Sequence, residues 1–101
     1  MEEERILGQI KINGESIELV RTHYADGRLA VIARTLEGAP YAKLSVNPGA
    51  DVELPENCIA VKTWSENSQL FAAAAMCPYF MMTGKQLHFG KEVAPIWEVI
   101  G

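Results

Sequence analysis

The sequence is short of cysteine, of basic residues and of long apolar runs, and each shortage excludes a class of protein. Nine Lys and Arg residues stand against 13 Asp and Glu, a formal net charge of −4, which excludes a nonspecific nucleic-acid binder because such proteins need a basic face. No apolar stretch approaches the roughly 20 residues of a membrane-spanning helix, so we expect no membrane contact. The chain starts Met1-Glu2-Glu3-Glu4, whereas a signal peptide starts with basic residues. With only two cysteines, Cys58 and Cys77, we expect a cytoplasmic protein with reduced thiols.

Length and composition favour one folded domain. The chain has 101 residues, of which 49% are apolar and 22% charged, values typical of a globular protein. A chain of this length buries enough surface for an ordinary core without disulfides or metals. We therefore expect a single domain over residues 1–101 that needs no cofactor.

Apolar alternation in the first half predicts a run of antiparallel strands. Apolar residues or glycine stand at every second position from Ile6 to Ile12, and Asn13-Gly14 follows as a strong hairpin signal. The segment Leu29–Ala33 is apolar at both parities, so we expect a central strand covered on both faces. The four predicted strands cover residues 6–12, 17–21, 29–33 and 41–46.

The second half predicts one helix among further strands. An acidic connection, Asn47 to Asn57, leads to a strand over Cys58–Lys62. A helix is expected from Glu66 to Met76, ended by Pro78, because Ala72 to Ala75 strongly favours helix. Its face with Leu70, Phe71 and Ala74 should pack on the sheet. A turn at 83–85 and strands at 87–89 and 93–100 complete an α+β fold: an antiparallel, curved sheet of about five to seven strands packed against one main helix.

Three segments, in order, resemble a known pattern. They are Tyr41-Ala42-Lys43-Leu44-Ser45-Val46-Asn47, Lys62-Thr63-Trp64-Ser65-Glu66-Asn67 and Ala94-Pro95-Ile96-Trp97. Together with Phe80 and Thr83-Gly84, they resemble a family of small uncharacterised proteins encoded on conjugative and phage-like mobile elements of bacteria. The resemblance runs from residue 28 to residue 99. Cys77-Pro78 and Met81-Met82 depart from it, since acidic and small residues are expected there.

The resemblance implies genomic company and no catalytic residue. Small inhibitors of host defence are common among the cargo genes of mobile elements. We therefore expect a non-enzymatic protein that binds another macromolecule, in its most concrete form an anti-defence inhibitor docking on a host immune complex such as a CRISPR effector. A structural or regulatory accessory of conjugation is an alternative.

Candidate partner-binding residues are the aromatic and acidic ones that a core does not need. A large protein interface needs a few aromatic anchors and a polar rim. An acidic rim would favour a partner with a basic, nucleic-acid-binding face. The candidates are Trp64, Glu66, Asn67, Asp51, Glu53, Glu56, Tyr79 and Tyr24. If Met81 and Met82 are exposed, they add an adaptable binding patch.

A second hypothesis is a metal-dependent or enzymatic module. It would use His23, His88, Cys58 and Cys77, whose side chains suit zinc. Structural zinc sites bring their ligands in closely spaced pairs, whereas the closest two of these four residues, Cys77 and His88, are 11 positions apart. We therefore expect no metal site, and buried or solvated cysteines and histidines instead.

Overall fold

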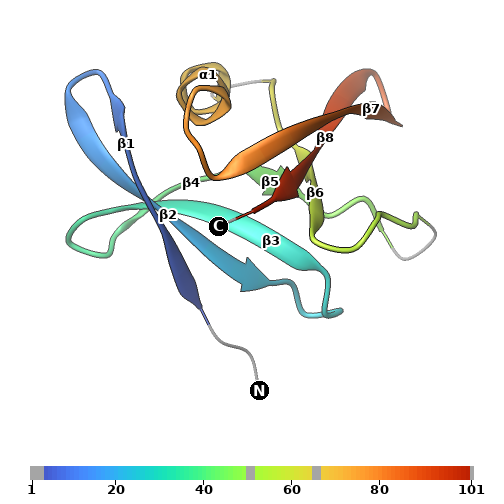
Figure 1. Cartoon of the computed structure of the whole chain (residues 1–101), viewed down its shortest axis with the longest axis horizontal. Coiled ribbons are helices and arrows are strands. Elements are labelled where there is room, and N and C mark those ends of the chain that lie inside the picture. Colours follow the sequence, from blue (N-terminus) through green and yellow to red (C-terminus); the bar gives the residue numbers. More distant parts are fainter. Residues whose placement is uncertain (1–3, 50–51, 65–66, 101) are drawn as a thin grey trace.

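The computed structural model describes residues 4–49, 52–64 and 67–100, which form two antiparallel four-stranded sheets and one helix (Figure 1). Sheet A has the strand order β1-β2-β3-β4 and sheet B the order β5-β6-β8-β7. The elements are β1 (Arg5–Ile12), β2 (Glu15–His23), β3 (Leu29–Thr35), β4 (Pro40–Lys43), β5 (Ser45–Val46), β6 (Cys58–Val61), α1 (Ser68–Ala75), β7 (Phe80–Phe89) and β8 (Glu92–Val99).

The α+β class is confirmed, but the prediction of one curved sheet with five to seven strands is wrong. The predicted strand 41–46 divides at Leu44 into β4, in sheet A, and β5, in sheet B. The Leu44 N–H donates to the Val31 carbonyl on β3 (3.1 Å), and the Leu44 carbonyl accepts from the Lys62 N–H just after β6 (2.8 Å). One residue therefore carries the chain from the first sheet to the second, as strands do at the corners of sheet packings.

Ser45 fixes this corner with its side chain. Its hydroxyl is buried and accepts a hydrogen bond from the Val31 N–H (3.0 Å), and it shares another with the Tyr24 hydroxyl (2.7 Å). A buried backbone N–H is costly to leave unpaired. The Ser45 hydroxyl thus takes the place that a continuing strand partner would otherwise fill.

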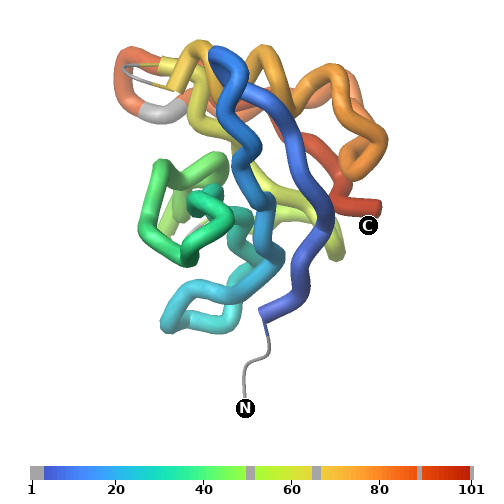
Figure 2. Tube along the Cα trace, turned by 90° about the vertical axis from the view of Figure 1, so that its left-hand side faces the viewer, coloured from blue at the N-terminus to red at the C-terminus, as the bar shows by residue number. Residues whose placement is uncertain are grey.

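The predicted β1–β2 hairpin is confirmed, and its tip contacts the helix. Asn13 and Gly14 both have positive φ (53° and 81°), as the predicted two-residue turn requires. Figure 2 shows the hairpin running along one side of the molecule, with its tip beside α1. There the Asn13 amide donates to the Gln69 side-chain carbonyl (2.9 Å).

Helix α1 packs on the core through the predicted face. Leu70 and Ala74 are buried, and the Phe71 ring stacks on Trp97 of β8 with 5.4 Å between ring centroids. The predicted start at Glu66 lies outside the described residues, and the helix ends at Ala75 rather than Met76. Before the helix, the Asn67 amide donates to the carbonyls of Lys43 (2.6 Å) and Lys62 (3.4 Å), so the helix is tied to both sides of the corner.

The predicted turn at residues 83–85 is wrong, because β7 continues through it. Its pairing with β8 shifts between Met82 and Gln86, and Gly84 lies there with a φ of 81°. The turn signal therefore marks an irregularity inside a ten-residue strand. In the part of the chain that the structure describes, no helix is long and apolar enough to cross a membrane.

Gly8 on β1 allows Tyr79, the residue before β7, to approach sheet A, and this can be tested. A Cβ at this position would lie 2.0 Å from the Tyr79 hydroxyl oxygen, so the ring would have to move. We expect Gly8→Ala to lower the free energy of unfolding by about 1–3 kcal/mol, the usual cost of overpacking, as measured by chemical denaturation. In a Tyr79→Ala background the cost should shrink, because the clash is gone. An equal cost in both backgrounds would contradict the contact.

The corner predicts a coupled pair of stability effects. Ser45→Ala removes the partner of the Val31 N–H and of the Tyr24 hydroxyl, so we expect a loss of about 1–3 kcal/mol. Tyr24→Phe should cost less, because it leaves the Val31 hydrogen bond in place. Tyr41→Phe, on an exposed tyrosine, serves as the control and should be neutral. If the Ser45 and Tyr24 effects were strictly additive in the double variant, the hydroxyl pair would not stabilise the corner.

Candidate functional site

A pocket of about 360 Å³ opens between the end of β2, the turn after it and the connection from β5 to β6. Its polar lining comes from Arg21, His23, Tyr24, Arg28, Glu56 and Asn57. Leu29, Val46, Pro48, Leu54 and Pro55 supply apolar wall, and Cys58 also lines it. The volume lies at the lower end of the range for small-molecule sites.

The pocket exists because the inward face of β2 changes character along the strand. Ile17 and Leu19 are fully buried in the core, and Arg21 and His23 follow at the same parity, so they point to the same side. Their partners on β3 are Val31 and Leu29. The core therefore ends at Arg21, and two basic side chains take up positions that would otherwise carry apolar residues.

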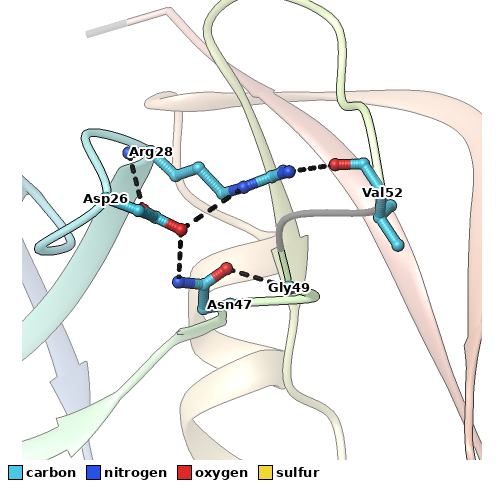
Figure 3. Close-up of polar contacts among 5 residues, drawn as sticks. All are labelled: Asp26, Arg28, Asn47, Gly49 and Val52. Carbon is cyan, nitrogen blue, oxygen red and sulfur yellow. Dashed lines mark hydrogen bonds and ion pairs between the residues drawn. The ribbon is translucent and has the colours of Figure 1, made fainter.

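A chain of polar contacts holds the pocket wall together (Figure 3). The Arg28 guanidinium donates to the Val52 carbonyl and forms an ion pair with Asp26 (Nε to Oδ2, 3.6 Å). The Asn47 side-chain amide donates to the same carboxylate (3.1 Å), and its Oδ1 accepts from the Gly49 N–H (3.1 Å). These contacts attach the connection after β5 to the turn between β2 and β3.

Burial and hydrogen bonding shift the pKa values of two groups in this region. The hydrogen bond from the Asn47 amide, followed by that from the Arg28 N–H, lowers the pKa of Asp26. Burial raises the pKa of Tyr24, although its hydrogen bond with Ser45 acts in the opposite direction. At neutral pH Asp26 is therefore charged, and the Tyr24 hydroxyl keeps its proton.

The Asp26 contact can be tested by titration. We expect NMR titration to place the pKa of Asp26 below that of an ordinary aspartate, because the Asn47 amide stabilises the charged form. In Asn47→Ala this pKa should rise, since the largest cause of the shift is removed. Asn13→Ala, an asparagine on the β1–β2 turn, is the matched control and should leave it unchanged. An unshifted Asp26 in the parent protein would show that the Asn47 contact does not form.

A second exposed feature lies at the other edge of sheet B. Met81 and Met82 on β7 are 54% and 60% exposed, so the condition set for an adaptable patch is met. They point to opposite faces of the strand. Met82 pairs with Trp97, and Met81 pairs with Glu98. We call these two residues the methionine edge.

The predicted partner-binding residues do not form one surface. Tyr24 and Glu56 line the pocket, and Glu53 lines a shallower hollow beside it, next to Arg28. Tyr79 lies over Gly8 and Trp64 is half-buried. Asn67 is 1% exposed, so its amide serves the fold. Asp51 and Glu66 lie outside the described residues.

The predicted cysteine and histidine set is only partly brought together. His23 and Cys58 line the pocket, whereas Cys77 follows α1 and His88 lies on β7. Within residues 4–49, 52–64 and 67–100, no group of three or more His, Cys, Asp or Glu side chains could hold a metal ion. Burial raises the pKa of both cysteines, which disfavours the thiolate that binds metals.

Sequence reasoning missed Arg21 and Arg28 as site residues. For Arg21 a signal was present: the apolar row Ile17, Leu19 continues at the same parity into Arg21 and His23. No family model matches the sequence, no curated protein matches it, and no solved structure matches its fold.

Proposed function

We propose that this protein is a non-enzymatic binding protein that docks on a protein partner through the methionine edge of β7. The observation that carries the proposal is the exposure of Met81 and Met82 on a strand at the edge of its sheet. Methionine is flexible and polarisable, and it is common on surfaces that adapt to a partner.

The edge itself supports strand addition as the way of binding. Among the described residues, no strand pairs with the outer side of β7. Edge strands normally avoid pairing with other chains through charges or bulges. Here the pairing irregularity and Lys85 follow Met82, so they protect only the later part of the strand. A partner strand added at residues 80–82 would lie between Met81 on one face and Met82 on the other.

The choice of partner follows from the resemblance and from the acidic connection. Resemblance to mobile-element proteins directs the proposal to a host immune complex such as a CRISPR effector, and to an anti-defence role. The exposed carboxylates of Glu53 and Glu56 would speed association with a basic, nucleic-acid-binding face. The alternative role, an accessory of conjugation, would use the same edge on a transfer protein.

Binding to purified host CRISPR effector complexes tests the proposal. We expect Met81→Glu and Met82→Glu each to weaken binding more than tenfold, mainly through faster dissociation, because a charge would enter an apolar contact. Leu36→Glu is the matched control: Leu36 is also an exposed apolar residue, at 53%, and lies beyond β3. We expect it to bind like the parent protein in biolayer interferometry. Equal losses from all three variants would contradict docking at β7.

Charge reversal at Glu53 and Glu56 distinguishes binding through the methionine edge from binding through the acidic connection. Glu53→Lys with Glu56→Lys should slow association at low salt and leave dissociation unchanged. If charge reversal abolished binding while Met81→Glu had no effect, the interface would lie at the acidic connection. If no effector complex bound the protein and conjugation frequency changed with Met81→Glu, the accessory role would replace the anti-defence role.

A further inference from the structure

We infer that the pocket beside Arg21 and Arg28 binds a small organic anion, an apolar body that carries one phosphate or carboxylate group. This site is separate from the proposed docking edge, and the inference does not depend on that edge. It rests on two arginines, Arg21 on β2 and Arg28 in the turn after it, that line one pocket. Arg21 is bound to a neutral acceptor, and the acidic partner of Arg28 is shared with Asn47.

Arg21 is the better candidate of the two arginines for binding an anion. Its guanidinium donates to the side-chain carbonyl of Asn57 (Nη2 to Oδ1, 3.0 Å), which is a neutral acceptor. Among the described residues, no carboxylate lies within ion-pair distance of Arg21. A guanidinium has five N–H donors in a planar fork, so most of them are left for an anion. Arg21 stands in the core-facing row of β2, is partly buried and lines the pocket.

Arg28 is held in place by the pocket wall. Its contacts with Asp26 and the Val52 carbonyl use part of the guanidinium and restrict its motion. A pre-positioned guanidinium loses less entropy when it binds an anion. His23 lies two residues beyond Arg21 on the same face and adds a further nitrogen donor.

The balance of charge and wall chemistry defines the ligand. Of the two carboxylates near the arginines, Asp26 is committed to Arg28 and Asn47. Glu56 is exposed at the rim. This leaves room for about one negative charge beside Arg21. Leu29, Val46 and Leu54 line the same space, so an anion with an apolar body should bind better than an inorganic ion.

Arginine recognises carboxylate and phosphate with the same two-pronged geometry, so both anions are tested. The probes are phenyl phosphate and benzoate, with inorganic phosphate and neutral benzyl alcohol for comparison. Each is titrated to about 10 mM, ten times the Kd of 1 mM that marks a weak site, and binding is followed by NMR. We expect saturable shifts of the backbone amides of Arg21, Arg28 and Asn57 with phenyl phosphate or benzoate. Inorganic phosphate and benzyl alcohol should bind at least several-fold more weakly.

Variants locate the binding at Arg21. We expect Arg21→Gln to weaken binding about tenfold or more, because hydrogen bonds between charged groups are lost. Arg21→Lys should give a smaller loss, since it keeps the charge without the fork. Lys11→Gln changes the net charge equally on β1, away from the pocket, and should have no effect. Circular dichroism checks that each variant is folded, and Arg21→Lys carries the test if Arg21→Gln is not.

Three results would overturn the inference. They are the absence of saturable binding by either organic anion, shifts that lie away from the pocket, and equal affinity in the parent protein and in folded Arg21 variants. Preference for phenyl phosphate over benzoate would assign the site to phosphorylated ligands, and the reverse preference would assign it to carboxylates. Either preference supports the anion site.

Discussion

The chain passes from sheet A to sheet B at Leu44, and the rest of the structure depends on this crossing. The N–H of this fully buried residue pairs with sheet A and its carbonyl with the chain beside sheet B. Neither sheet can shift against the other without breaking one of these hydrogen bonds. Asn67 binds the carbonyls of Lys43 and Lys62 on either side of the corner, so the start of the helix is fixed relative to the same corner. Its Oδ1 is buried with no hydrogen-bond partner among the described residues. This costs free energy that the two carbonyl contacts must offset.

The pocket depends on the same corner through a short series of contacts. The Ser45 hydroxyl holds Tyr24, which stands at the start of the turn after β2. That turn carries Asp26 and Arg28, and these two residues hold the connection after β5 through Asn47 and Val52. The corner residue thus positions the turn, and the turn positions the pocket wall. A substitution at Ser45 would therefore change the pocket wall although Ser45 does not line the pocket, because each group in the series is positioned by the one before it.

The local sequence pattern predicted the elements whose structure is set by neighbouring residues. It failed for elements whose bounds are set by tertiary contacts. The β1–β2 hairpin, the helix and its buried face follow from the Asn13-Gly14 pair and from helical spacing. The break at Leu44 has no local signal: the segment 41–46 alternates as one strand, and only pairing with two different sheets divides it. At Thr83-Gly84 the opposite error arose, since a turn signal yielded to the pairing of β7 with β8. Of the pocket, the parity of Arg21 and His23 was legible in the sequence. The approach of the connection 47–57 was not, because it depends on contacts between residues more than 20 positions apart.

The two proposed surfaces adjoin the same rung of sheet B. Cys58, which lines the pocket, pairs with Glu98 on β8, and Glu98 pairs in turn with Met81 on β7. These three residues form one rung of sheet B, and adjacent strands are about 4.8 Å apart, so roughly 10 Å separates the ends of the rung. If both ligands bind, any effect of the anion on partner affinity must be matched by an equal effect of the partner on anion affinity, because the coupling free energy belongs to the pair. The β8 strand lies between β6 and β7, and its Trp97 ring contacts the rings of Phe71 and Phe80.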